Sequence, residues 1–183
     1  MTAGDYRGKR VLDVTLAVSA CIMFAPLVAV ITVAIWLEDR GAPFFTQIRV
    51  GRARTTFRIL KFRTMRAGVV TRVGGWLRRT GLDELPQFVN VCRGDMSIVG
   101  PRPLTLEDIT RLDWSSEVHD WRFAMNPGIT GIAQLAGGRS ARHSARLDRV
   151  YLRRQSAALD LCMIALSFIV NVVGKTTVRG WIR

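Results

Sequence analysis

Residues 14–37 read VTLAVSACIMFAPLVAVITVAIWL, a run of 24 residues with no charged side chain. As a helix with a rise of about 1.5 Å per residue the run would be roughly 36 Å long, whereas the hydrocarbon core of a bilayer is about 30 Å thick. The length therefore allows a membrane-spanning helix. Pro26 stands in the middle of the run. It removes one backbone hydrogen bond and clashes with the preceding turn, so we expect a kink there.

Both flanks of the apolar run are basic. Arg7, Lys9 and Arg10 precede it, and Arg40 begins the basic stretch that follows. Because basic flanks favour the cytoplasmic side, both ends have the same preference. Two interpretations stay open: a straight, slightly kinked transmembrane anchor, and a re-entrant hairpin that breaks at Pro26 and returns to the side it came from. A cleaved signal peptide is disfavoured, since the run is long for one and no clean cleavage site follows.

The composition also indicates a membrane protein. The chain of 183 residues has 27 Lys plus Arg against 14 Asp plus Glu, a net charge of +13, a pI near 11.3, 49% hydrophobic residues and a mean hydropathy of +0.17. A basic excess points to an anionic partner, either nucleic acid, a lipid surface or phosphate-bearing substrates. The hydrophobic content excludes intrinsic disorder and favours the membrane, so we expect no nucleic-acid partner. The odd number of cysteines, three without a CxxC pair, predicts a cytoplasmic polar part.

The chain after residue 40 predicts an α+β part. Residues 44–50 and 56–62 are rich in β-branched and aromatic side chains, with the sequence GRAR between them, so we expect a short β-hairpin. We expect helices from residue 74, over 105–123, over 140–155 and over 157–173, separated by glycine- and proline-rich stretches at 94–103 and 126–138. The prediction is one mainly helical domain over residues 1–183, with a membrane-inserted segment at 11–37 and a cytoplasmic part at 41–183.

The last two expected helices have the features of interfacial helices. Basic side chains recur at spacings of three and four residues on one helical face, at Arg139, Arg142, Arg146, Arg149 and Arg153. This face is either a solvated charged surface or a surface that meets phosphates. The apolar run at 161–173 has 13 residues, too few to span a bilayer, and favours an interfacial or buried amphipathic helix.

Two adjacent carboxylates, Asp83 and Glu84, lie in the basic sequence RRTGLDELPQ at 78–87. Nearby cations keep a carboxylate ionised and available as a nucleophile or as a Mg²⁺ ligand. The alternative is purely structural, with Thr80 as the N-cap of a helix and Asp83 in its first turn. Spacing alone does not decide between them.

Arg102 stands between Pro101 and Pro103, in the sequence GDMSIVGPRP at 94–103. The two prolines fix the backbone on both sides of the arginine. A guanidinium held in one place suits a phosphate clamp, because its donors match phosphate oxygens in pairs. A rigid turn with no ligand explains the same pattern.

Taken together, the motifs resemble those of one family. They are KRVLD at 9–13 before the proline-interrupted apolar run, FTQIRVG at 45–51, KFRTM at 61–65, LDELPQ at 82–87, GDMSIVGPRP at 94–103, PGITG at 127–131 and LDRVY at 147–151. In this order they strongly resemble the bacterial sugar transferases, the monotopic phosphoglycosyl transferases that start surface-glycan assembly. The resemblance covers essentially the whole chain. The chain departs from the family at Gly81, where serine is usual, and at Ala25, where serine commonly precedes the proline.

The resemblance implies an enzyme that transfers a sugar 1-phosphate from a UDP-sugar to polyprenyl (undecaprenyl) phosphate and releases UMP. It implies Mg²⁺ as cofactor, and Asp83 as the nucleophile that forms a covalent phosphosugar intermediate and as a metal-binding residue, assisted by Glu84. The residues expected to hold phosphates are Lys61, Arg78, Arg102 and Arg139, and the expected polar supports of the site are Asp148 and Asp160.

The resemblance also implies a location. A re-entrant helix broken at Pro26 would hold the enzyme in the bacterial inner (cytoplasmic) membrane, with the catalytic part on the cytoplasmic face and anionic lipids as further partners. The alternative from another class is a basic, membrane-bound interaction protein without catalysis. The identity of the sugar, the glycan pathway and the oligomeric state are left open.

Overall fold

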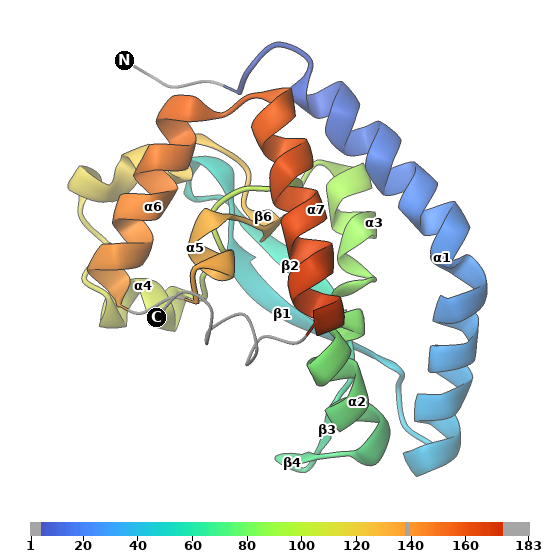
Figure 1. Ribbon diagram of the computed structural model, residues 1–183. Helices are drawn as coiled ribbons and strands as arrows, with labels where there is room; N and C mark the ends of the chain where they lie inside the picture. Colours follow the sequence, from blue (N-terminus) through green and yellow to red (C-terminus); the bar gives the residue numbers. More distant parts are fainter. Residues whose placement is uncertain (1–4, 138–139, 174–183) are drawn as a thin grey trace.

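The computed structural model describes residues 5–137 and 140–173 as one mainly helical domain with short strands (Figure 1). The helices are α1 (Lys9–Asp39), α2 (Arg72–Thr80), α3 (Gln87–Arg93), α4 (Leu106–Arg111), α5 (Ile132–Leu135), α6 (Ala141–Arg154) and α7 (Ala157–Val173). The strands are β1 (Phe44–Val50), β2 (Thr56–Phe62), β3 (Met65–Arg66), β4 (Val69–Val70), β5 (Ser97–Val99) and β6 (Gly128–Thr130). Three 3₁₀ segments are η1 (Arg52–Arg54), η2 (Leu82–Glu84) and η3 (Glu117–Ala124). The predicted α+β class is confirmed.

Helix α1 contains the whole apolar run. It continues through Pro26 as one helix, so the expected break between two helices is not seen. The axis of α1 instead changes direction about halfway along (Figure 1), which is how a helix accommodates a proline ring while losing little of its hydrogen bonding. Within the described ranges, α1 is the one helix whose length and hydropathy would suffice to cross a membrane.

One face of α1 packs against the domain along both halves of the helix. Its buried apolar residues, Ala17 and Ala20 before the proline and Ile31 and Ile35 after it, recur at helical spacing. The opposite face is exposed and apolar, with large side chains at Val11, Val18, Ile22, Met23, Val30, Val33, Trp36 and Leu37. Both halves therefore lie on the same body.

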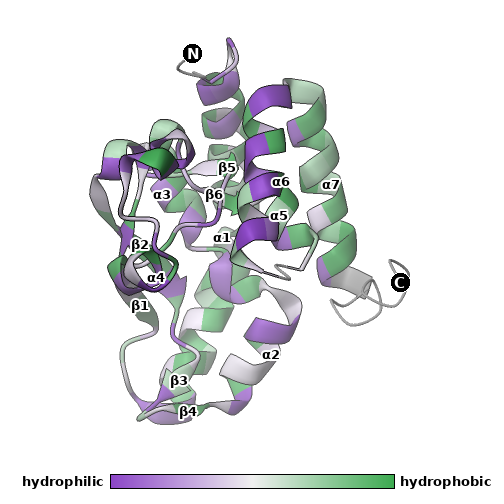
Figure 2. Cartoon of the chain, turned by 90° about the vertical axis from the view of Figure 1, so that its left-hand side faces the viewer, coloured by the Kyte–Doolittle hydropathy of each residue, from purple (hydrophilic) through white to green (hydrophobic). Residues whose placement is uncertain are grey.

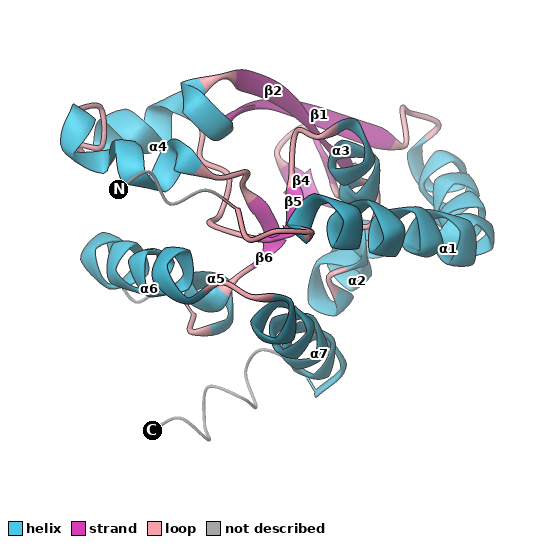
Figure 3. Cartoon of the chain, turned by 90° about the horizontal axis from the view of Figure 1, so that it is seen from above, coloured by secondary structure: helices cyan, strands magenta, loops and turns pink. Residues whose placement is uncertain are grey.

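The expected β-hairpin is confirmed with its predicted bounds. Strands β1 and β2 pair antiparallel from Phe44 opposite Phe62 to Val50 opposite Thr56. Two further pairs were not expected. Strands β3 and β4 are antiparallel, and β5 and β6 are parallel, although the segments of β5 and β6 were predicted as loops. Figure 3 shows the β5–β6 pair near the middle of the domain with helices around it. Strands of three residues separated by a long connection leave no periodic pattern in the sequence.

The prediction of a helix over residues 105–123 is wrong in its second half. Thr105 caps α4 in a capping box with Asp108, and the helix ends at Arg111. Asp113 then adopts a left-handed conformation at φ 55°, and the N–H of Trp114 bonds to the carbonyl of Ile109 at 2.9 Å. This turn buries the Trp114 ring, which is 5% exposed, before the chain continues as η3.

Buried charges fix the start of α1. The Nζ of Lys9 lies 2.7 Å from an oxygen of Asp160, the residue in the first turn of α7, and both are almost fully buried. The hydroxyl of Tyr151 donates to the other oxygen of Asp160 at 2.6 Å. Asp13, one turn along α1, accepts the N–H of Ile98 on β5 at 3.1 Å. These bonds join α1, α6, α7 and β5.

The other end of α1 is tied to the same body. Glu38 accepts the N–H groups of Arg72 and Val73 at the start of α2, at 2.7 and 3.2 Å. Asp39 forms an ion pair with Arg63, just after β2. Contacts at both ends of α1 thus hold the apolar helix along the side of the domain.

We predict that Lys9→Met destabilises the protein by about 3 to 5 kcal/mol, because it leaves the buried Asp160 carboxylate without its cation. The measurement is thermal or chemical unfolding of the detergent-solubilised protein. Arg7→Met, at an exposed residue two positions away, is the matched control and should change little. A double variant that also replaces Asp160 by Leu should recover part of the loss. Equal stability of Lys9→Met and the parent protein would contradict the role given to this pair.

Candidate active site

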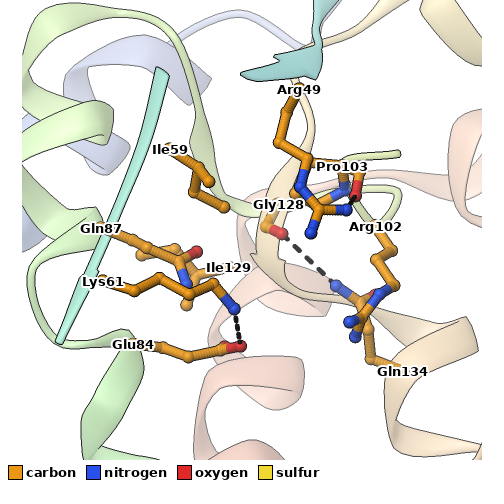
Figure 4. A pocket seen from close by; sticks show the side chains of 10 residues that line it. All are labelled: Arg49, Ile59, Lys61, Glu84, Gln87, Arg102, Pro103, Gly128, Ile129 and Gln134. Carbon is orange, nitrogen blue, oxygen red and sulfur yellow. Dashed lines mark hydrogen bonds and ion pairs between the residues drawn. The ribbon is translucent and has the colours of Figure 1, made fainter. Parts of the chain in front are cut away.

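A cavity lies between the β-hairpin, the turn before α3 and the loop that follows β5. Its lining comprises Arg49, Ile59, Lys61, Glu84, Gln87, Arg102, Pro103, Gly128, Ile129 and Gln134. Figure 4 shows Lys61, Glu84 and Gln87 on one side of the cavity and Arg49, Arg102 and Gln134 on the other. Three of the lining residues are cations and one is a carboxylate. The site therefore suits a ligand that carries negative charge.

The hairpin and the proline-flanked loop position the cations. Lys61 lies near the end of β2, and its Nζ is 2.8 Å from an oxygen of Glu84. Arg49 on β1 donates from Nη1 to the carbonyl of Pro103 at 3.2 Å, which ties its guanidinium to the loop of Arg102. Burial lowers the pKa of Arg49, and the neighbouring Arg102 cation lowers it further. Two guanidiniums this close favour an anion between them.

Asp83 and Glu84 lie in the 3₁₀ turn η2, directly after α2. The capping alternative is wrong, because Thr80 is the last residue of α2 and its hydroxyl donates to the carbonyl of Trp76 at 3.0 Å. Gly81 reverses the chain with a left-handed φ of 74°. Both carboxylates are partly buried; Glu84 lines the cavity, and Asp83 is the adjacent residue of the same turn.

The turn also packs against the last described helix. A Cβ added to Gly81 would lie 3.1 Å from the side-chain oxygen of Asn171 on α7. Glycine therefore meets two requirements here, a positive φ and the close approach of Asn171. Serine is usual at this position in the family, but here Asn171 leaves little room for a side chain.

Asp148 supports the site through a second residue. Its carboxylate accepts from the Nε of Arg122 at 3.0 Å, and both side chains are buried. Arg122 donates in turn to the backbone carbonyl of Arg102 at 2.8 Å. Burial raises the pKa of Asp148, while the Arg122 cation opposes that rise. The pair thus holds the backbone of the loop that presents Arg102 to the cavity.

The structure brings together only some of the predicted site residues. Lys61, Glu84 and Arg102 line the cavity. Arg78 on α2 donates from Nε to the hydroxyl of Thr64 at 2.8 Å and is not part of the lining. Asp160 belongs to the charge cluster at the start of α1. Arg139 lies outside the described residues. The phosphate-binding roles of Lys61, Arg78, Arg102 and Arg139 stay predictions.

Three charged or polar side chains of the lining were not expected: Arg49, Gln87 and Gln134. Arg49 stands in the FTQIRVG motif, where it counted only as one basic residue among many. Gln87 follows Asp83 by four residues in LDELPQ. Its place in this motif could have indicated a role in the site, whereas a glutamine side chain by itself does not. Gln134 lies in α5, within a stretch that was predicted to be a loop.

The acidic turn fits the magnesium ion that was predicted. In the described part of the chain no three His, Cys, Asp or Glu side chains cluster around a common point. Mg²⁺ needs no such cluster, because proteins commonly bind it through one or two carboxylates together with substrate phosphates. Asp83 and Glu84 supply carboxylates beside a cationic cavity, and this is the donor set that such a site requires.

These features define a cationic cavity beside an acidic turn, in a domain that carries a long apolar helix. The comparisons place the chain more closely. Residues 5–174 match the bacterial sugar transferase family, and the chain belongs to that family.

Several of the relatives have names that describe transfer to undecaprenyl phosphate. A UDP-glucose:undecaprenyl-phosphate glucose-1-phosphate transferase of Caulobacter vibrioides is 41% identical over 84% of this chain and 61% of its own length. A UDP-N-acetylgalactosamine-undecaprenyl-phosphate N-acetylgalactosaminephosphotransferase of Aeromonas hydrophila is 37% identical over 85% of this chain and 41% of its own length. The exopolysaccharide production protein ExoY of Sinorhizobium fredii is 32% identical over 85% of this chain and 81% of its own length.

The chain spans only part of the length of most of these relatives. It matches between 35% and 61% of the length of five curated relatives, which include the Caulobacter and Aeromonas proteins.

We predict that Gly81→Ala destabilises the protein by about 1 kcal/mol or more, because alanine disfavours a positive φ, and because its methyl group would press on Asn171. For a domain of this size the melting temperature should fall by about 2 to 4 °C per kcal/mol. Gly75→Ala is the matched control, since it lies within α2 with its nearest neighbour 3.8 Å away. A melting temperature as high for Gly81→Ala as for Gly75→Ala would show that the turn tolerates a side chain.

Proposed function

We propose that the protein transfers a sugar 1-phosphate from a UDP-sugar to polyprenyl phosphate and releases UMP. The observation that carries this proposal is the cavity that Arg49, Lys61 and Arg102 line together with Glu84, with Asp83 next to Glu84 in the same turn. Both substrates bear phosphates, and both would be drawn to these cations. Relatives named as undecaprenyl-phosphate sugar phosphotransferases support the same reaction.

The reaction proceeds in two displacements at phosphorus. A carboxylate oxygen of Asp83 attacks the β-phosphorus of the UDP-sugar, and the bond from that phosphorus to the bridging oxygen breaks, so UMP leaves with the electron pair. A phosphate oxygen of the polyprenyl phosphate then attacks the phosphorus bound to Asp83. The Asp83–phosphorus bond breaks, which forms the polyprenyl diphosphate sugar and restores the carboxylate.

The other residues of the cavity stabilise charge and orient groups. Lys61 and Arg102 bind the oxygens of the diphosphate and offset the charge that accumulates as the bridging bond breaks. Glu84, 2.8 Å from the Nζ of Lys61, keeps the lysine over the reacting group, and the lysine cation orients the incoming acceptor phosphate. The buried Asp148–Arg122 pair holds the Arg102 loop in place before substrate arrives.

A magnesium ion bound by the diphosphate and Asp83 would neutralise charge on the substrate. The protein would contribute the acidic turn η2 to that site, and the phosphates would supply further oxygen ligands.

We predict that Asp83→Asn lowers turnover by at least three orders of magnitude, because an amide does not form the phosphosugar bond. The measurement is UMP release from a panel of UDP-sugars with polyprenyl phosphate and Mg²⁺. The matched control is Asp113→Asn, at an exposed residue, which should retain full activity. With the acceptor omitted, the parent protein should gain the mass of one phosphosugar and Asp83→Asn should not. Full turnover by Asp83→Asn would exclude the covalent mechanism.

We further propose that α1 enters one leaflet and returns, with the domain on the cytoplasmic face of the bacterial inner membrane. Both ends of α1 bond to the same body, at Asp160 and at the start of α2. A straight crossing of the bilayer would either pull that body into the hydrocarbon core or break one of the two sets of contacts. The bend near Pro26 and the exposed apolar outer face suit a shallow, one-sided insertion.

Helices α6 and α7 supply further contacts for the lipid surface. Helix α7 exposes large apolar side chains, at Leu161, Leu166, Phe168 and Ile169. Figure 2 shows α7 largely in the hydrophobic colour and the adjacent α6 with hydrophilic patches. The exposed basic residues of α6, namely Arg142, Arg146, Arg149 and Arg153, give that helix a charge suited to anionic lipid head groups.

We predict that residues on the two sides of α1 are labelled from the same side of the membrane. The variants Arg7→Cys and Ala42→Cys place single cysteines at exposed positions, in a background where Cys21, Cys92 and Cys162 are replaced by Ala. A membrane-impermeant thiol reagent should reach both only from the cytoplasmic side of oriented vesicles. Labelling of the two cysteines from opposite sides would establish a transmembrane α1 and exclude the re-entrant insertion.

A further inference from the structure

Three buried polar atoms of the cavity have no hydrogen-bond partner within the described residues: the Nε of Arg49, the Nε2 of Gln87 and the Oε1 of Gln134. Buried polar atoms are nearly always bonded, since desolvation without a partner costs stability. Arg49 belongs with the cations that suit a phosphate. The two carboxamides are neutral. A phosphate oxygen can accept a hydrogen bond from the Nε2 of Gln87, but it does not donate one to the Oε1 of Gln134, so the phosphate-binding role of the site does not account for Gln134.

Gln87 is well placed to contact the group that reacts. It is 2% exposed and is the first residue of α3, directly after Pro86 and four residues after Asp83. Its side chain extends into the cavity beside Lys61 (Figure 4). It is thus a buried polar side chain aimed at the space next to the acidic turn.

Gln134 faces the cavity from the opposite side with a defined orientation. Its Nε2 donates to the carbonyl of Gly128 at 3.4 Å, which directs Oε1 away from that carbonyl. An unpaired carbonyl oxygen needs a ligand that donates a hydrogen bond. The oxygens of an ionised diphosphate only accept hydrogen bonds, so a phosphate does not satisfy Gln134.

A hydroxyl group meets the needs of both glutamines, because it donates one hydrogen bond and accepts others. In a nucleotide sugar the hydroxyls closest to the attacked phosphorus are those of the sugar. The apolar side chains of Ile59 and Ile129 also line the cavity and suit the carbon–hydrogen face of a sugar ring. Resting on the proposed function, we propose that Gln87 and Gln134 bind hydroxyl groups of the transferred sugar and thereby set sugar selectivity.

The test compares Gln87→Met and Gln134→Met with the parent protein. Methionine keeps the approximate length of the side chain and removes both the donor and the acceptor. Gln155→Met, at the end of α6 and outside the cavity lining, is the matched control. Calorimetry measures the binding of UDP and of the preferred UDP-sugar in an Asp83→Asn background, so that no phosphosugar adduct forms. Kinetics with Asp83 intact measures kcat/KM for that UDP-sugar and for its deoxy analogues.

We expect each cavity variant to bind the UDP-sugar about tenfold more weakly, the loss of one hydrogen bond to a buried group, with UDP binding unchanged within twofold. The parent protein should also lose about tenfold in kcat/KM with at least one deoxy analogue. The variant that lacks the glutamine contacting the missing hydroxyl should have the same kcat/KM for that analogue as for the full UDP-sugar. The control should behave like the parent in every measurement.

Two results would overturn the sugar contact. One is equal weakening of UDP and UDP-sugar by the cavity variants, which would place the glutamines on the nucleotide. The other is a finding that the parent protein binds the UDP-sugar no more tightly than it binds UDP. A parent protein that discriminates the sugar in binding but releases no UMP would instead refute the proposed reaction, while the sugar contact would stand on the calorimetry.

Discussion

The buried pair of Lys9 and Asp160 is the interaction on which the arrangement of the domain depends. It joins the start of the apolar helix to the first turn of α7, and Tyr151 of α6 donates to the same carboxylate. A buried ion pair contributes little net stability, but loss of one partner leaves an uncompensated charge in the interior. The pair therefore contributes to the conformational specificity of the fold, because its two charges meet in only one placement of α1 relative to α6 and α7. An apolar helix without such a contact could pack on the domain in several registers.

The same use of buried charge recurs behind the cavity. The Asp148–Arg122 pair does not face the ligand, but it bonds to the backbone carbonyl of Arg102, and Arg49 bonds to the carbonyl of Pro103. The proline-flanked loop is thus held from two sides. A cation fixed in advance binds a phosphate without losing further side-chain freedom, which is the source of preorganised electrostatic stabilisation. Flexible lysines on the surface would offer the same charge with less discrimination.

The sequence predicted those features whose causes are local. The hairpin at 44–50 and 56–62 and the last two helices follow from patterns within a few residues. Asp83 and Glu84 were candidates from their sequence neighbours, but the turn that holds them, between α2 and α3, was not predicted. The β5–β6 pair was missed because its strands are three residues long and far apart in the chain. The helix predicted over 105–123 failed at Asp113, where burial of Trp114 outweighs helix propensity. Gln87 and Gln134 became candidates only once their burial was known, because a glutamine in a sequence looks like any other surface residue.

The membrane helix and the cavity share a core, and this links their positions. Ile31 and Ile35 of α1 pack with Phe62 at the end of β2 and with Leu77 of α2. Phe62 is the neighbour of Lys61, and α2 leads through Gly81 into the turn of Asp83. Because protein cores are close-packed, a shift of α1 along its axis would displace both the lysine and the acidic turn. In the proposed insertion, the depth at which α1 lies in the bilayer therefore sets the height of Asp83 above it. A polyprenyl phosphate carries its phosphate at the head-group level, so under the proposed function a domain locked to a shallow helix would present Asp83 to that phosphate without a separate positioning step.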